Sequence, residues 1–252
     1  MHKQSGYRYQ NPAAVAMAAF MSFFAEGASA NSNSAVGGAT VDAGKTAIEW
    51  RLAMSEDDDN AGQDQRVRTR VHIDHAFSDL YAARLVYSMD RRKGDNLEFD
   101  GLSLQNRFHI LKKEDYGFDG GIRLNYTFAD GDKKPDVLSL RFYQQIPYKA
   151  WEVRFNQIIE TEIGEDRDGG MLAEWRSQVT YAVNDNLRVG LDAFHDFGNL
   201  DEQSGYSDQE HAVGPVVKAK LGGGYSLEAA YRVGISDASA DQSGTFILTK
   251  SW

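Results

Sequence analysis

Apolar and polar residues alternate with a period of two along most of the chain after residue 40. Successive side chains of a β-strand point to opposite faces, so this period predicts strands rather than helices. Twelve strands are predicted, at residues 44–55, 65–77, 79–90, 97–109, 116–128, 136–147, 150–162, 170–182, 186–197, 209–221, 224–235 and 243–252. Strands of this length are long for a soluble sheet and match tilted strands that cross a membrane.

The connections between these strands fall into two classes. Odd-numbered strands are followed by long acidic segments such as EDDDNAGQD (56–64) and NLDEQSGYSD (199–208), and most even-numbered strands by short ones such as PYKA (147–150) and VNDN (183–186). Short periplasmic turns that alternate with longer outer loops are typical of transmembrane β-barrels. The sequence therefore predicts an all-β fold, a transmembrane antiparallel up-and-down β-barrel of about twelve strands with both termini periplasmic.

The two faces of the predicted strands differ in chemistry. In TAIEWRLAM (46–54), Ile48 and Trp50 lie on one face, and Glu49 and Arg51 lie on the other. A small soluble barrel would fill its apolar face with aliphatic core residues, whereas here aromatic residues gather near strand ends, as they do at membrane interfaces. These aromatic residues are Trp50, Phe77, Tyr81, Tyr87, Phe128, Trp151, Tyr181, Tyr225 and Tyr231. The polar faces carry charges of both signs, which suits the lumen of a barrel.

The beginning of the chain has the layout of a secretory signal peptide. Lys3 and Arg8 precede an apolar run at residues 13–25, and the small residues ASA follow at 28–30. A buried N-terminal helix is the alternative, since the run is too short to span a bilayer with ease. We expect a signal peptide at 1–30, a flexible lead-in at 31–43 and the transmembrane barrel at 44–252, so the protein is exported to the cell outer membrane.

Composition excludes several classes of function. The formal net charge of −10 argues against a nucleic-acid partner, and the absence of cysteine excludes disulfides and thiolate metal sites. The acidic segment at 55–60 lacks the ligand spacing of a calcium loop, so a solvated loop is the simpler interpretation. No metal and no cofactor is predicted.

Arginine lies mostly at strand positions on the polar face, whereas lysine lies mostly in the connections. The predicted pore-lining and substrate-binding residues are Arg51, Arg66, Arg68, Arg70, Arg123, Arg141, Arg154, Arg176, Arg188, Arg232, Glu49 and Glu174. Two interpretations stay open. The arginines pair with carboxylates and hold the lumen together, or the run Arg66, Arg68 and Arg70, which spans roughly 13 Å on one face, forms a track for an anionic solute.

These features together resemble the twelve-stranded monomeric outer-membrane channels, in particular the oligogalacturonate-specific porins and their sialic-acid-channel relatives. The signal peptide, the length of the mature chain, the number of strands, the arginine-rich inner face and the terminal aromatic residue carry the resemblance. The resemblance implies a porin-like channel for small solutes, with anionic solutes as candidates, and a monomer in contact with outer-membrane lipid and lipopolysaccharide.

The last predicted strand contains GTFILTKSW (244–252), in which Phe246, Leu248 and Trp252 share one face. This pattern is similar to the C-terminal signature that the barrel-assembly machinery recognises, and these three residues are the predicted assembly signal. Lys250 departs from the pattern, although a lysine near a strand end can extend its ammonium group to the interface.

Two other classes of function remain as alternatives. A structural or adhesive outer-membrane barrel without transport would share all these features. A lipid-modifying outer-membrane enzyme would need a histidine with an orienting carboxylate near the outer rim, and His195 with Asp196 is the best-placed pair, with His211 nearby. The chain lacks the HxS triplet of the lipid A deacylases, and histidines in a polar lumen explain the pattern more simply, so no enzyme activity is predicted.

Overall fold

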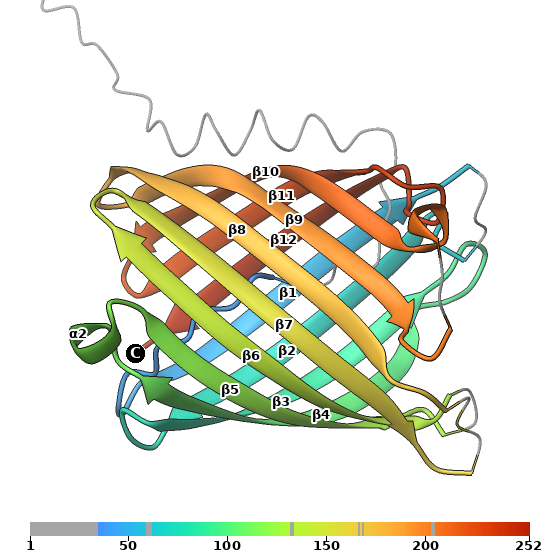
Figure 1. Ribbon diagram of the computed structural model, residues 1–252, viewed down its shortest axis with the longest axis horizontal. Helices are drawn as coiled ribbons and strands as arrows, with labels where there is room; N and C mark the ends of the chain where they lie inside the picture. Colours follow the sequence, from blue (N-terminus) through green and yellow to red (C-terminus); the bar gives the residue numbers. More distant parts are fainter. Residues whose placement is uncertain (1–34, 59–61, 132–133, 166, 168, 203–204) are drawn as a thin grey trace, which may run out of the picture.

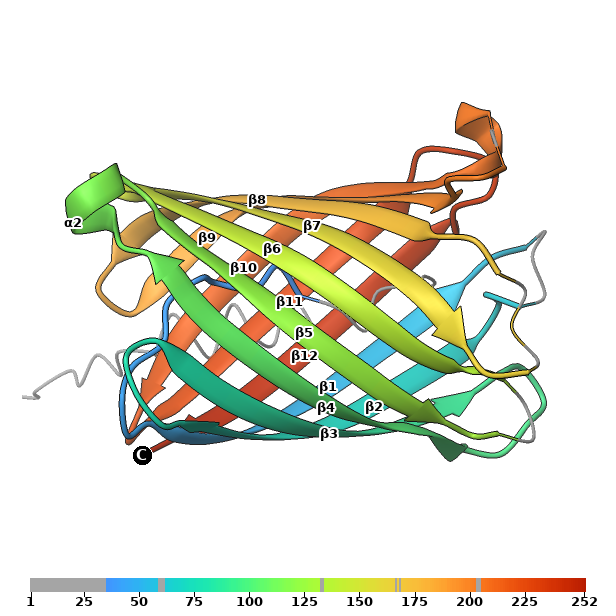
Figure 2. The same cartoon turned by 60° about the horizontal axis from the view of Figure 1, so that its bottom comes forward.

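The computed structural model describes residues 35–252 except 59–61, 132–133, 166, 168 and 203–204, so the predicted signal peptide lies outside the described residues. Twelve strands in this part of the chain form one closed antiparallel barrel, in which each strand pairs with its neighbours in sequence and the last pairs with the first (Figures 1 and 2). The strands are β1 (Thr46–Glu56), β2 (Arg66–Ala76), β3 (Tyr81–Arg91), β4 (Glu98–Leu111), β5 (Asp119–Ala129), β6 (Asp136–Tyr148), β7 (Trp151–Ile163), β8 (Leu172–Asn184), β9 (Leu187–Asn199), β10 (Glu210–Gly222), β11 (Tyr225–Gly234) and β12 (Gln242–Ser251).

The predicted fold is confirmed, and the predicted strands correspond one to one with those observed. The largest shift is at the start of β5, predicted at residue 116 and observed at Asp119. A short helix, α2 (Lys113–Tyr116), precedes β5 and was not predicted. Gly117 ends this helix with φ 78°, a left-handed conformation that glycine adopts without a steric cost.

The barrel closes where β1 meets β12. The amide of Thr46 donates to the carbonyl of Trp252 at 3.1 Å, and the amide of Trp252 donates to the carbonyl of Thr46 at 3.0 Å. Figure 1 shows the C-terminus at the same rim as α2, and the two-residue turns 149–150, 185–186 and 223–224 connect strands at this rim. We call it the short-turn rim and the opposite end the long-loop rim. The periplasmic position of the termini stays a prediction.

The outside of the barrel is apolar and the inside is polar. On β2, Val71 and Ile73 are exposed, and His72 between them is buried; on β9, Leu191 is exposed and the adjacent Asp192 is buried. A soluble domain has the opposite arrangement, with its apolar side chains inside. The arrangement seen here is expected for a barrel in lipid, because lipid surrounds the barrel with apolar chains and the lumen can hold water and charge. Among the described residues, no helix has both the length and the apolar character needed to span a bilayer.

Loops cover part of the long-loop rim. Lys93, in the β3–β4 connection, forms an ion pair with Asp64 of the β1–β2 connection, and this hydrogen bond and the charge of Asp64 raise the pKa of Lys93. The amide of Asp58 donates to Asp241 of the β11–β12 connection at 3.2 Å, and Ala240 beside it is buried. The long connections therefore hold one another in place.

The first described residues of the chain, 35–41, lie inside the barrel. The sequence predicted a flexible lead-in at 31–43, and its described part, 35–43, packs against the wall. The amide of Ala43 donates to Asp79 at 3.3 Å, and Val41 forms a buried apolar cluster with Ala76 and Ala82. From the short-turn rim this segment therefore leads into the lumen rather than away from it.

Gly214 is predicted to be required for the seam between β10 and β11. A Cβ atom there would lie 1.9 Å from the carbonyl oxygen of Tyr231, and the following Pro215 has no amide hydrogen to donate. We expect Gly214→Ala to lower the free energy of unfolding in lipid vesicles by about 1–3 kcal/mol, measured by urea titration of tryptophan fluorescence. The control is Gly131→Ala, where a Cβ would meet no atom within 4 Å. Equal midpoints for the two variants would contradict the prediction.

Candidate functional site

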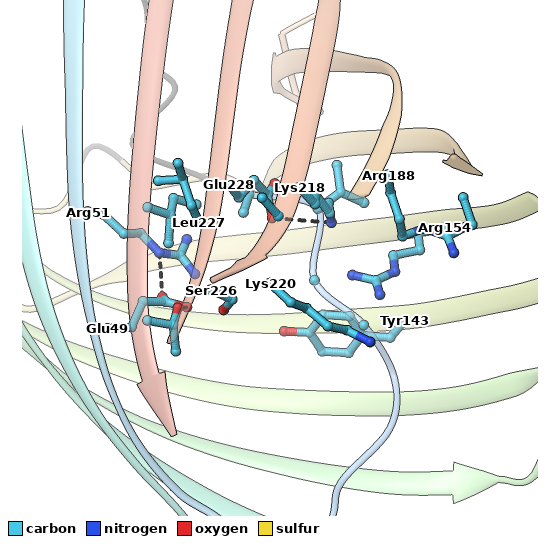
Figure 3. Close-up of a pocket in the computed structure, with 18 of the residues that line it drawn as sticks. Glu49, Arg51, Tyr143, Arg154, Arg188, Lys218, Lys220, Ser226, Leu227 and Glu228 are labelled. Atoms are coloured by element: carbon cyan, nitrogen blue, oxygen red, sulfur yellow. Dashed lines mark hydrogen bonds and ion pairs between the residues drawn. The ribbon is translucent and has the colours of Figure 1, made fainter. Parts of the chain in front are cut away.

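A cavity of about 700 Å³ occupies the lumen on the side of the short-turn rim. Residues Asp185 and Asn186 of the β8–β9 turn lie in its lining, so it reaches that rim. Its wall comes from strands on all sides of the barrel, and residues 35–38 of the internal segment complete it. Figure 3 shows Tyr143, Arg154, Arg188, Lys218 and Lys220 around this space.

The lining of the cavity is strongly cationic. Among the described residues, nine cationic side chains and three carboxylates line it. The cationic residues are Arg51, Arg84, Arg107, Arg123, Arg141, Arg154, Arg188, Lys218 and Lys220, and the carboxylates are Glu49, Asp185 and Glu228. An excess of one sign in a concave site with low-dielectric walls concentrates the field and attracts the opposite ion. The protein as a whole has a net negative charge, so the excess of positive charge is a local feature of this part of the lumen.

Some of these cations are neutralised within the wall. Arg51 donates to Glu49 at 2.6 Å, and Lys218 lies 3.2 Å from Glu228, as the dashed lines in Figure 3 show. Arg154 pairs with Glu152 at 2.8 Å. Such pairs fix long side chains in place along the lumen and leave little net charge at these positions.

A second pairing centre lies on β1, β2 and β3. Arg84 donates to Asp74 at 2.6 Å and lies 3.8 Å from Glu49, which also contacts His72 at 2.9 Å. The carboxylate of Glu49 therefore contacts Arg51, His72 and Arg84 at once. Buried charged groups usually have several such partners.

Three of the lining arginines lie on neighbouring strands and form a group of like charges. Arg107 on β4 is directly opposite Arg123 on β5, and Arg123 is directly opposite Arg141 on β6. Side chains in such cross-strand positions have Cβ atoms about 5 Å apart, and like charges there are destabilising. We call these three residues the arginine row.

No described carboxylate lies within ion-pair distance of the arginine row. Arg123 donates to the side-chain oxygen of Gln105 at 3.1 Å, and Arg141 lies 6.0 Å from the ring centre of Tyr143. The Nε atoms of Arg123 and Arg141 are buried without a hydrogen-bond partner in the described part of the chain. Buried cations are usually paired, so the arginine row differs from the paired arginines elsewhere in the lumen.

Half of the predicted site residues lie around this cavity and half do not. Those that line it are Arg51, Arg123, Arg141, Arg154, Arg188 and Glu49. Those that lie elsewhere in the lumen are Arg66, Arg68, Arg70, Arg176, Arg232 and Glu174.

Arg66 and Arg68 of the predicted track share one carboxylate. Arg66 donates from Nε to Asp90 Oδ1 at 3.0 Å and from Nη2 to Oδ2 at 2.7 Å, a two-point pairing. Arg68 lies 3.5 Å from the same carboxylate. The track along β2 stays a prediction, and two of its three members have a structural partner.

Arg232 belongs to a buried network in the part of the lumen away from the main cavity. It donates to both carboxylate oxygens of Asp192, at 2.8 and 2.7 Å, and to Thr245 at 3.2 Å, and it lies 4.0 Å from the ring centre of Phe194. Arg176 pairs with Glu174 close by, and these residues line a second cavity of about 30 Å³. Arg232 on β11 thus cross-links to Asp192 on β9, whereas Arg176 and Glu174 pair within β8.

The structure adds lining residues that were not among the predicted site residues. They include Ala35, Val36, Gly37, Gly38, Arg84, Arg107, Tyr143, Lys218 and Lys220. The alternation of the strands already places Arg84 and Arg107 on the polar face, but only the pairing register shows which of the inward arginines meet. Nothing in the sequence indicated that the small residues before β1 would enter the lumen.

The histidines of the enzyme alternative contact each other. His195 Nδ1 lies 3.0 Å from His211 Nδ1, and the ring of Tyr206 stacks on His211 at 4.4 Å. Asp196 accepts a hydrogen bond from the amide of Gly198 at 2.9 Å. Among the described residues, no group of three or more histidine, aspartate or glutamate side chains is arranged to hold a metal ion.

The buried pair of Arg232 and Asp192 is predicted to be essential for barrel stability. Asp192→Asn would leave a buried guanidinium without its carboxylate, so we expect the free energy of unfolding to fall by about 3–5 kcal/mol. The control is Asp42→Asn, whose partner Lys45 is exposed and whose loss should cost less than about 1 kcal/mol. Urea titration in lipid vesicles measures both, and similar losses in the two variants would contradict the prediction.

No protein-family model and no curated protein sequence matches the chain. The fold is similar to that of solved porins. A KdgM porin has a TM-score of 0.57 at 8% identity, over 82% of this chain and 99% of that chain. A KdgM porin in complex with disordered oligogalacturonate has a TM-score of 0.54 at 8% identity, over 82% and 99%. A NanC porin has a TM-score of 0.55 at 8% identity, over 81% and 97%. At this identity the likeness is one of fold, and the chain has the antiparallel β-barrel fold of the outer-membrane porins.

Proposed function

We propose that the protein is a porin-like channel of the outer membrane that passes small anionic solutes. The observation that carries this proposal is the arginine row, three like charges in direct cross-strand register that line a cavity of about 700 Å³. A purely structural lumen would pair these cations, as the chain does for Arg232. Rings or ladders of arginine are a known way to select anions in pores.

The arginine row would act as an intermediate binding place for a solute on its way through the lumen. An anion that leaves water loses hydration, and guanidinium groups replace it with charge-assisted hydrogen bonds. The planar fork of arginine suits carboxylate in particular, because two parallel N–H groups meet two oxygens. Several neighbouring arginines let the anion exchange partners without being held tightly at any one of them.

Acidic sugars are therefore the first solutes to test. A KdgM porin has been solved in complex with disordered oligogalacturonate, and it shares the fold of this chain. The shared fold and the unpaired arginines support the same class of solute here, with carboxylate groups as the feature recognised.

The proposal includes location and assembly. A signal peptide at 1–30 would direct export, the short-turn rim would face the periplasm, and the barrel would reside as a monomer in contact with lipid and lipopolysaccharide. The exposed apolar outer face supports a lipid environment. The barrel-assembly machinery would recognise Phe246, Leu248 and Trp252 on the last strand. Trp252 is exposed at the rim and Phe246 packs edge-on against Trp50 at 5.9 Å.

Replacing the arginine row should reduce anion preference. In planar bilayers we expect the triple variant Arg107→Gln, Arg123→Gln, Arg141→Gln to lower the anion-to-cation permeability ratio about threefold to tenfold, equivalent to about 0.7–1.4 kcal/mol. The reversal potential in a KCl gradient gives this ratio. A matched control, Arg91→Gln, Arg92→Gln, Lys113→Gln, removes the same charge from exposed positions. The proposal fails if the wild-type protein gives no single-channel steps, or if both triple variants keep the wild-type ratio.

Trp252 is predicted to contribute to assembly. With Trp252→Ala we expect less folded barrel in isolated outer membranes, because the aromatic side chain of the recognised strand is lost while its backbone pairing is kept. The fraction that migrates as a compact species in unheated gel samples measures this. Trp50→Ala, which removes an indole from the facing strand at the same seam, is the control. Wild-type recovery of Trp252→Ala would count against the assembly signal.

A further inference from the structure

Residues 35–41 (AVGGATV) pack against the inner wall of the barrel, and the first four of them, 35–38, line the cavity. Val36 and Ala39 are 1% and 0% exposed, so the wall and the segment enclose them almost completely. The pale blue coil in Figure 3 is this segment, and it passes the cavity residues on its way from the short-turn rim. None of its side chains is charged, and all are small.

Two amide side chains of the wall hold the backbone of the segment. Asn156 on β7 accepts a hydrogen bond from the amide of Gly37 at 2.7 Å and donates one to the carbonyl of the same residue at 3.1 Å. Gln145 on β6 accepts a hydrogen bond from the amide of Ala39 at 3.1 Å. These contacts recognise main-chain groups in the way that a neighbouring strand would. We call Asn156 and Gln145 the amide clamp.

The amide clamp is itself positioned by the wall. The side-chain nitrogen of Gln145 donates to Glu152 at 2.8 Å, and Glu152 pairs with Arg154. Asn156 also donates to the carbonyl of Phe155 at 2.7 Å. Contacts within the wall thus help to orient both amides, whose oxygens accept hydrogen bonds from the segment.

The fit of the segment depends on two glycines. A Cβ atom on Gly37 would lie 2.6 Å from Cε1 of Tyr143, and one on Gly38 would lie 2.7 Å from Oε1 of Gln145. Tyr143 and residues 35–38 also line the cavity that contains the arginine row. The segment thus occupies space that a solute would otherwise use, next to the cations that would bind it.

We propose that residues 35–41 are an internal plug, held by the amide clamp, that limits the width of the lumen and moves to admit larger solutes. The inference rests on the proposed channel function. Three hydrogen bonds to two side chains and the burial of Val36, Ala39 and Val41 hold the plug. Backbone pairing holds every strand of the wall along its whole length, so the plug is the part of the lumen that can move without opening the barrel. Because it has no charged side chain, its movement leaves the charge balance around the arginine row unchanged.

The first test is conductance in planar bilayers. Asn156→Ala with Gln145→Ala should raise the single-channel conductance at least about twofold, because pore diameter governs conduction, and deletion of residues 35–41 should do the same. Asn125→Ala is the matched control, since Asn125 is also a buried amide of the lumen but donates to Thr127 and Ser139 instead of the segment. Equal conductance of the wild-type protein and the clamp variant would overturn the plug and leave the channel standing.

The second test does not need conduction. The chain has no cysteine, so Val36→Cys introduces a single thiol in the plug. A membrane-impermeant maleimide should label it slowly in vesicles, and at least about tenfold faster when the amide clamp is replaced by alanine, because labelling follows the population of the open form. Glu114→Cys, exposed on α2, gives the rate of full access.

The two tests distinguish a failure of the proposed channel function from a failure of the proposed plug. If no variant conducts, the proposed function fails, and the labelling rate of Val36→Cys still decides whether the segment is held by the clamp. If Val36→Cys is labelled as fast as Glu114→Cys with the clamp intact, the plug is overturned whatever the conductance.

Discussion

The rest of the structure depends on one constraint, that a backbone amide or carbonyl has no partner in lipid other than the protein itself. A sheet with an open edge would leave a whole row of such groups unpaired, at a cost of several kcal/mol for each. The pairing of β1 with β12, completed by the two hydrogen bonds between Thr46 and Trp252, removes that edge. Closure then fixes what each strand presents, an apolar side chain outward and a polar one inward, alternately along its length.

That alternation places many charged side chains in the narrow lumen, and these side chains occur there in two arrangements. Toward the middle and the long-loop side, Arg232 and Asp192 form a fully buried pair that cross-links the strands. Around the main cavity the arginine row faces the lumen without a carboxylate partner among the described residues. The first arrangement gives rigidity, and the second leaves a local excess of positive charge. One barrel therefore combines a stabilising network with a row of like charges, on which the proposed anion selectivity rests.

The internal segment changes how the cavity is understood. The wall alone would describe a wider passage, but residues 35–38 fill part of its cross-section and the amide clamp fixes them there. Sterics explain why two residues of this segment are glycine, since a Cβ atom on Gly37 or Gly38 would clash with Tyr143 or Gln145. The width of the cavity thus depends on the internal segment as well as on the wall, whereas its charge comes from the strands.

The sequence by itself determined the twelve strands, their faces and the two kinds of rim, because a period of two and the turn residues are local properties that each strand displays without its neighbours. It also placed Arg123 and Arg141 on the inner face. What it left open is which inward residues meet. The opposition of Arg107 and Arg123 depends on the β4–β5 register, which the α2 turn, Gly117 and an irregularity between His109 and Leu111 set together. The position of residues 35–41 depends on amides more than a hundred residues away. Only the tertiary structure decides such contacts, because they arise from the closure of the barrel and leave no periodic signal in the sequence.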